Sequence, residues 1–375
     1  MLVAGCGTTE AVNWALSLPD WQVDAVDLSD NSIAIARHLA DQLDVKNLTI
    51  RLGNIEAGEG FDGPYTFINS QGVLHHFNDP AKGLAQLEKH LSPGGVMSLM
   101  LYSDSNRWFL QRGQRLFQLL LDQVEEDREQ AAYEVCRTGS TSPNRLQTVF
   151  QSGVKNFEQD RPQFADTLLN PQEVSYTIPS LIDWLASAGM EMICPVYPDV
   201  WNPRAALGEK GAKLYDQLSP TQQWEVCDLV IGPLFFFVAR RVADRGPQRP
   251  CATEDDLFWQ IVPRVFSATV YDVKELAVIQ PPTTRSPIIE QAGNNIRISR
   301  NKEAWSGFHP VAASLLQLID GKRTLRQIAE QAATQHGATF EQVEDMLRGY
   351  LHHIIEQQGL AAADVSHCTN CPLRK

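Results

Sequence analysis

Short apolar runs alternate with amphipathic segments over the first hundred residues. Leu2–Ala4 is typical of the end of a buried strand, and a helical pattern opens near Glu10. The same reading predicts an amphipathic helix over 80–91 and a turn at 92–95. It predicts further strands over residues 23–28, 48–52, 65–70 and 96–102. Strands that alternate with helices indicate an α/β fold with a parallel sheet.

Gly5 and Gly7 lie between the first predicted strand and the first predicted helix. Glycine lets the backbone approach a ligand, and the helix N-terminus faces that ligand, so the pattern indicates a nucleotide-cofactor site. Taken alone, a G-x-G can equally be a tight turn that binds nothing. Asp27 strengthens the cofactor interpretation, because a carboxylate at the carboxyl end of the second strand can accept ribose hydroxyls. Asp24 is the weaker candidate, since it lies earlier in the strand.

Four segments carry a family resemblance. They are VAGCGTTE at 3–10, VDLS at 26–29, GNIE at 53–56 and GVLHHFNDPAKGLAQLEKHLSPGGVMSLMLY at 72–102. On these motifs the chain resembles the class I S-adenosylmethionine-dependent methyltransferases of the small-molecule type. The likeness is specific to about residue 102 and continues more loosely to about 241. It implies a Rossmann-like seven-stranded sheet, S-adenosyl-L-methionine as the methyl donor, and methyl transfer to a small-molecule or peptide-borne acceptor.

The resemblance also implies the donor site. The residues expected to bind the donor are Ala4, Gly5, Cys6, Gly7, Asp27, Leu28, Asn54, Ile55, Ser70 and Gln71. Two positions depart from the family pattern: Thr9 stands where a third glycine is common, and Asn54 stands where an aspartate usually meets the adenine. Family members usually carry a helical segment before the first strand, so we expect either an unusual start or a start placed too late.

His75 and His76 are the candidate acid–base residues, because they follow the fourth strand, where the family places the reacting sulfonium. A histidine can take a proton from a hydroxyl or amine acceptor near neutral pH. The alternative is that both only line the donor pocket, since methyl transfer by in-line displacement can rest on positioning alone. Tyr102 and Tyr176 are the candidate acceptor-binding residues.

Residues 104–177 interrupt the minimal fold as a predicted helical insertion, with one long helix over 106–130 and a polar turn at 137–144. In the resembled fold this segment lies over the donor, so it is a candidate lid for the acceptor. A helical pair that completes the core or forms a dimer face is the open alternative. A helix over 179–188 and strands over residues 190–197 and 234–240 then complete the first domain, residues 1–241.

A Pro-containing polar linker opens residues 242–287, which are expected to be linker and extended chain. Residues 288–362 resemble the small, mainly α winged-helix domain of PqqD-like proteins, with helices expected over residues 309–319, 324–335 and 341–357. Such a domain can capture a peptide at a strand edge, or it can serve only in dimerisation. Residues 363–375 read as a tail. Its Cys368 and Cys371 are two ligands of the four a structural zinc needs, which leaves an intermolecular zinc clasp as a minor alternative.

Net charge, apolar runs and cysteine content limit the binding partners and the location that we expect for the protein. The formal net charge of −13 disfavours broad nucleic-acid binding, because phosphates would be repelled. No apolar run approaches the ~20 residues that span a membrane, and no signal peptide is recognised. Seven irregularly spaced cysteines suggest reduced thiols, so we expect a cytoplasmic enzyme without a metal, and a homodimer is an option. The competing function is a non-catalytic scaffold that acts through the C-terminal domain.

Overall fold

The computed structural model describes residues 1–124, 127–159, 161–170, 172–195, 201–245 and 322–344, four short strands between 270 and 299, and Leu315 and Leu318. Seven strands follow one another across the main sheet in the order β3-β2-β1-β4-β5-β8-β7, and β6 pairs with β5 beside them. These strands are β1 Leu2–Ala4, β2 Val23–Asp27, β3 Leu48–Leu52, β4 Tyr65–Gln71, β5 Leu91–Ser103, β6 Ser175–Tyr176, β7 Met190–Pro195 and β8 Phe235–Arg241. The predicted α/β sheet is confirmed.

The first five strands along the chain run in one direction, and β8 runs in the opposite direction. Strands β1 to β5 are parallel to one another, whereas β8 runs antiparallel to β5 and to β7. The helices are α1 Glu10–Ser17, α2 Asp30–Gln42, η1 Ile55–Ala57, η2 Leu74–His76, α3 Pro80–Lys89, α4 Asp104–Leu120, α5 Arg128–Gly139, α6 Gln147–Gln159, α7 Arg161–Phe164, the π-helix η3 Ala165–Leu169, α8 Ile178–Ser187, α9 Arg204–Tyr215, α10 Pro220–Ile231, η5 Val242–Asp244 and α13 Leu325–His336.

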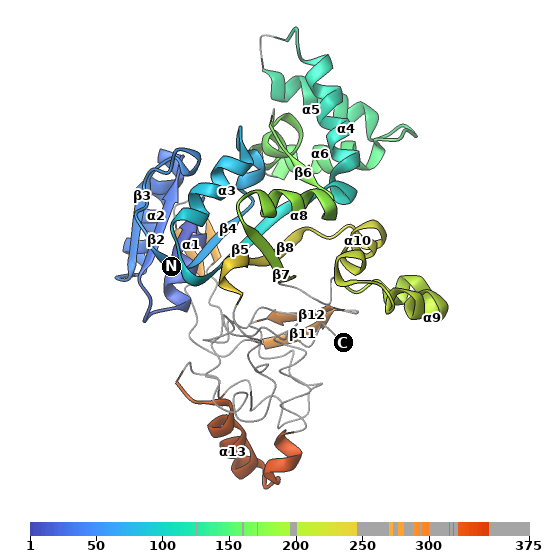
Figure 1. Ribbon diagram of the computed structural model, residues 1–375. Helices are drawn as coiled ribbons and strands as arrows, with labels where there is room; N and C mark the ends of the chain where they lie inside the picture. Colours follow the sequence, from blue (N-terminus) through green and yellow to red (C-terminus); the bar gives the residue numbers. More distant parts are fainter. Residues whose placement is uncertain are drawn as a thin grey trace.

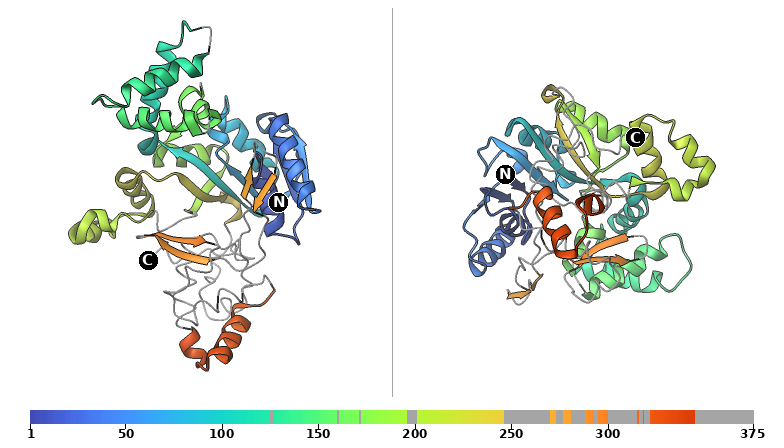
Figure 2. Two further views of the ribbon diagram at one scale, coloured as in Figure 1. Left: turned by 180° about the vertical axis from the view of Figure 1, so that it is seen from behind. Right: turned by 90° about the horizontal axis from the view of Figure 1, so that it is seen from below.

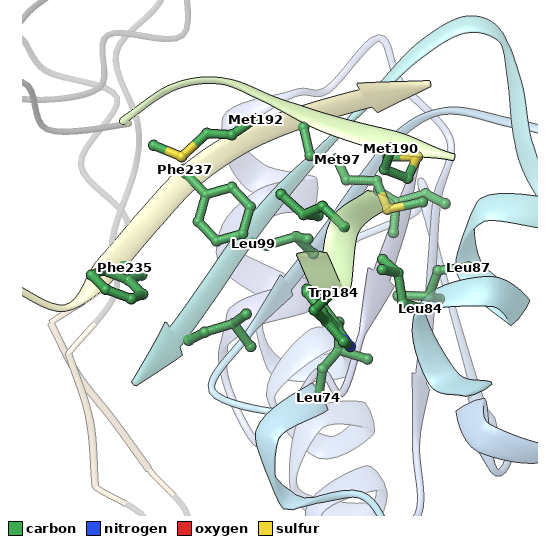
Figure 3. Packing of buried hydrophobic residues seen from close by; sticks show 14 of the residues in the cluster. Leu74, Leu84, Leu87, Met97, Leu99, Trp184, Met190, Met192, Phe235 and Phe237 are labelled. Carbon is green, nitrogen blue, oxygen red and sulfur yellow. The ribbon is translucent and has the colours of Figure 1, made fainter. Parts of the chain in front are cut away.

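The sheet is covered on both faces, because side chains of successive strand residues point to opposite sides. In β1, Leu2 joins the core cluster that α3 and α8 complete, and Val3 joins the cluster that α1 and α2 complete. Figure 3 shows the first cluster, whose buried side chains include Trp184 of α8, Leu84 of α3 and Phe237 of β8. Because strands β1 to β5 are parallel, their carboxyl ends lie at one edge of the sheet, where ligands of such sheets bind.

Two local expectations were wrong. The turn expected at 92–95 lies inside β5, where the register to β4 jumps from Tyr65–Leu91 to Phe67–Val96. The segment is a bulge at Gly94, whose φ is +73°, so the chain stays paired on both sides of it.

The long helix expected over 106–130 is also wrong, because α4 ends at Leu120 and α5 begins at Arg128. Leu121 lies four residues after Phe117, on the same face of the helix, and both are buried in a cluster of the insertion's own helices. Leu120, on another face, is 50% exposed.

The insertion has a core of its own. Phe117, Cys136, Phe150 and Phe164 belong to one buried cluster that shares no member with the clusters of the sheet. Figures 1 and 2 show α4, α5 and α6 grouped to one side of the sheet, beyond the end of β5. No helix in the described part of the chain is long and apolar enough to cross a membrane.

Beyond the main sheet the structure describes two hairpins, β9 Val270–Asp272 with β10 Ala277–Gln280 and β11 Ile288–Ala292 with β12 Asn295–Ser299. The helix expected over 324–335 is present as α13, and Thr324 caps it with a reciprocal bond to Gln327. Most of the helices expected over 309–319 and 341–357, and the C-x-x-C tail, lie outside the described residues. The PqqD-like likeness therefore stays a prediction.

Candidate functional site

The glycine loop follows β1 at the carboxyl edge of the sheet. The backbone N–H groups of Gly5 and Cys6 donate to the carbonyl of Val26 at 2.8 and 3.1 Å, which fixes the loop beside β2. Gly5 has a φ of +78°, and a Cβ placed there would lie 2.2 Å from a methyl carbon of Val73. Gly7 has a φ of +54°, but no described atom lies within 4 Å of the point its Cβ would take. A side chain at position 5 would therefore collide with Val73, whereas the space above Gly7 is open to a ligand.

Asp27 ties this loop to the next one. Its Oδ2 accepts the N–H of Gly7 at 2.8 Å, and its Oδ1 accepts the N–H of Ser29 at 2.9 Å. Each carboxylate oxygen keeps further acceptor capacity, so the group can also take hydroxyls of a ligand. Leu28, the next residue, exposes 72% of its surface and offers an apolar face beside the carboxylate.

The third strand ends beside Asp27, since the N–H of Gly53 donates to the Asp27 carbonyl at 3.0 Å. The side chain of Asn54 accepts the N–H of Ala57 and so begins η1, while Ile55 is 5% exposed and packs into the core. Of the two predicted residues here, Asn54 has the more open side chain, and Ile55 supports the turn from below.

A polar chain that the sequence analysis missed runs below the end of β4. Gln71 Nε2 donates to Asn69 Oδ1 at 3.0 Å, and Asn69 Nδ2 donates to Glu10 Oε1 at 2.6 Å. Burial raises the pKa of Glu10 to about 7, against the opposing effect of the Asn69 bond. Ser70 is 1% exposed, and its hydroxyl has no hydrogen-bond partner among the described residues. The alternation of Asn69 and Gln71 on one strand face was the available signal.

These groups fit a nucleoside-type ligand. The acceptor pair of Asp27, the open space above Gly7 and the unpartnered hydroxyl of Ser70 come from the ends of adjacent strands. The buried thiol of Cys6 takes no visible part, because burial and the Asp27 charge raise its pKa to about 12. Ala4, fully buried at the end of β1, supports the loop through packing.

Both predicted histidines lie in η2, directly after β4, and they meet Tyr102 of β5. The ring centroid of His75 lies 3.9 Å from that of Tyr102 and 4.3 Å from that of His76. His75 is fully buried, and neither of its ring nitrogens has a partner among the described residues. Burial lowers its pKa to about 3, and the charges of His76 and Arg107 act in the same direction. His75 is therefore neutral at physiological pH.

The insertion forms a wall of this histidine cluster. The Arg107 guanidinium lies 3.7 Å from the Tyr102 ring centroid, and its Nε donates to Glu173 Oε1 at 2.7 Å. The N–H of Val174 donates to the His75 carbonyl at 2.9 Å, and β6 pairs with the end of β5.

Tyr176, the other predicted acceptor residue, lies elsewhere. It is 5% exposed, and its ring centroid lies 5.3 Å from that of Trp184 within the core. Burial raises the pKa of its hydroxyl to about 12. This placement favours a packing role, because the ring contacts Trp184 within the core.

Comparisons with known proteins agree with this geometry. Residues 2–97 match a family model described as a methyltransferase domain. The solved structure of PKMT2 from Rickettsia typhi, determined alone and with AdoHcy, superposes with a TM-score of 0.63. The superposition covers 95% of this chain and 69% of that one, at 14% and 15% identity, so it shows the fold.

A curated, uncharacterized protein of Synechococcus is 27% identical over 255 residues. The match covers 64% of this chain and 60% of the relative's length. The family model, the strand order and the glycine loop all concern the same N-terminal half of the sheet. Residues 2–97 of this chain therefore match a methyltransferase-domain model, and the chain shares its fold with PKMT2.

Proposed function

We propose that the protein binds S-adenosyl-L-methionine and transfers its methyl group to a small-molecule or peptide-borne acceptor. The observation that carries the proposal is the Asp27 carboxylate, which holds the Gly7 N–H at 2.8 Å beside a loop that is open above Gly7. The family match over residues 2–97 supports the same reaction class.

Each strand end has a part in this proposal. Asp27 takes the ribose hydroxyls, Leu28 packs against the adenine, and Asn54 faces the adenine edge. Gly5, Gly7 and Ser70 line the remainder of the donor. S-adenosylmethionine supplies an electrophilic methyl group on a sulfonium. The protein's task is then to hold donor and acceptor in line and to exclude water.

The acceptor side is proposed at the histidine cluster. His75, His76 and Tyr102 lie together beyond the ends of β4 and β5, and Arg107 and Glu173 bring the insertion against them. This contact supports the lid role of the insertion over a purely structural one. We also propose a cytoplasmic location, a homodimer and peptide capture by the C-terminal region.

The test is donor binding by isothermal calorimetry. Asp27→Ala removes a charged carboxylate that accepts hydrogen bonds, so we expect the free energy of donor binding to weaken by about 1.5–3 kcal/mol. Asp24→Asn is the matched control on the same strand. The Asp24 carboxylate accepts the Tyr65 hydroxyl at 2.9 Å and belongs to the frame of the sheet, so donor affinity should persist. Equal affinities of wild type and Asp27→Ala would reject the ribose assignment. A wild type that does not bind would favour the scaffold.

A further inference from the structure

The two histidines of η2 are adjacent in sequence but differ in access. His75 is fully buried beneath Tyr102, and neither ring nitrogen reaches a polar atom of the described chain. His76 is partly exposed, and only its Nδ1 has polar contacts there. Its Nε2 is therefore the imidazole nitrogen that a second substrate can reach.

The contacts of Nδ1 decide which nitrogen carries the proton. Nδ1 of His76 lies 3.1 Å from the carbonyl oxygen of Gln172 and 3.2 Å from Nδ2 of Asn170. A carbonyl only accepts and an amide N–H only donates, so Nδ1 can bond one of them.

The Asn170 amide has other partners. Its Oδ1 accepts the Gln172 N–H at 3.0 Å, which fixes its orientation, and its Nδ2 reaches Asp166 Oδ1 at 3.3 Å. The Gln172 carbonyl has no other donor among the described residues. Protonated Nδ1 therefore satisfies the Gln172 carbonyl, while Asn170 directs one Nδ2 hydrogen to Asp166, and it leaves the lone pair on Nε2 of His76.

We propose that Nε2 of His76 takes the proton of a methyl acceptor bearing an O–H or N–H group, and that the Gln172 carbonyl of the insertion holds the histidine in the tautomer this requires. The inference rests on the proposed methyl transfer and names the acceptor class. Asn170 is a positioning residue, because it orients Gln172 and contacts no reacting atom.

The step balances without any further reagent. A lone pair of the acceptor's oxygen or nitrogen forms the bond to the donated methyl carbon. The methyl–sulfur bond breaks, and its electron pair stays on sulfur as a neutral thioether. The acceptor's proton moves to Nε2 of His76, which becomes an imidazolium whose Nδ1–H still faces the Gln172 carbonyl. The Gln172 carbonyl faces the Nδ1–H group and stabilises the imidazolium cation, as the orienting group of a catalytic histidine does.

The local geometry suits a positioned element. Gln172 follows the π-helix η3, a form that often marks functional sites. Arg107 and Glu173 pair beside it with side chains 13% and 2% exposed, and Val174 bonds to the His75 backbone at 2.9 Å. Three consecutive insertion residues, Gln172 to Val174, are thus anchored at the histidine cluster.

The first experiment reads the tautomer directly in the full chain. Protein labelled with ¹⁵N-histidine is examined by long-range ¹H–¹⁵N correlation, with His76→Gln used to assign the signal. We expect protonated Nδ1 and bare Nε2 in the wild type and in Gln172→Ala, which keeps the main-chain carbonyl. Asn170→Ala removes the amide donor that competes for Nδ1, so the same tautomer should persist in that variant. Protonated Nε2 in the wild type or in Asn170→Ala would overturn the proposal.

The second experiment uses labelled S-adenosylmethionine with three probes: a phenol, a primary amine and benzoate. We expect transfer to the phenol or the amine, and a loss of roughly 10²–10⁴-fold in turnover for His76→Gln. Donor affinity of that variant, measured by calorimetry, should be unchanged. Transfer to benzoate alone, which needs no base, would contradict the acceptor class, as would intact donor binding without transfer to any probe. A wild type that binds no donor would instead reject the proposed function, while the tautomer result would still stand.

Discussion

Gly5 and Gly7 share a left-handed backbone, with φ of +78° and +54°, but their surroundings differ. Alanine at either position carries the left-handed cost of about 1–2 kcal/mol. Gly5→Ala adds a collision, since its Cβ would lie 2.2 Å from a Val73 methyl, whereas Gly7→Ala meets no described atom within 4 Å. We expect Gly5→Ala to lower the free energy of unfolding by roughly 1–3 kcal/mol more than Gly7→Ala, as overpacking does. Urea unfolding measures both, and Val73→Ala should relieve part of the Gly5→Ala loss.

Glu10 gives a pH dependence whose sign follows from its burial. Its pKa rises from 4.5 to about 7 on folding, so the folded state favours the protonated form. Its contribution to stability is fully present below pH 4.5 and is lost as the pH rises through 7. We expect Glu10→Gln to flatten the fall in unfolding free energy between pH 5 and pH 8, measured by urea titration at both values. An equal fall in the variant would show that Glu10 is not the titrating group.

The local parts of the candidate site could be predicted from the sequence, and the long-range pairs could not. Gly7 and Asp27 can be identified as candidates because a glycine turn and a strand-end carboxylate have recognisable neighbours in the chain. Asn69 meets Glu10 across 59 residues, and His76 meets Gln172 across 96. Neither pair has a spacing that any local period reveals, so both became visible only with the fold.

At the scale of elements, strands were predicted well and the insertion poorly. Strands such as β2 and β4 appear in the sequence as short runs with several apolar residues that end in polar residues. The insertion instead packs on itself, and Leu121 at the end of α4 is buried in the insertion's own core. The expected helix over 106–130 therefore ran on past the turn where α4 stops.

The separate core of the insertion predicts separable stability. Phe117 is 1% exposed in the insertion core, and Phe237 is fully buried in the core of the sheet. Each alanine substitution should cost about 3–5 kcal/mol locally. We expect Phe117→Ala to speed amide hydrogen exchange in α4 to α6 while donor affinity persists, and the matched Phe237→Ala to speed exchange in β5 and β8. Loss of donor binding in a folded Phe117→Ala protein would show that the two cores are coupled.

Considered as a whole molecule, the chain places all its predicted donor contacts before residue 77, although β8 and β7 close the sheet only after residue 189. The insertion and the last two strands complete the sheet on the side away from β2 and β3. The proposed donor residues are therefore contiguous in sequence and fall within the range 2–97 that the family model matches. The proposed acceptor side combines segments from β4 to β6, and a sequence pattern cannot assemble it.

This division predicts what removal of the C-terminal region does. A chain ended after residue 245 keeps the main sheet, both of its helical layers and the insertion. We expect it to bind S-adenosylmethionine with the affinity of the full chain, measured by calorimetry. If the C-terminal region captures a peptide acceptor, truncation should raise the apparent KM for that acceptor and leave kcat similar, the mark of lost uniform binding. If it only dimerises the protein, truncation should change the mass in solution, measured by light scattering, and neither kinetic constant. A folded truncated chain that no longer binds the donor would contradict both versions and show that the C-terminal region completes the donor site.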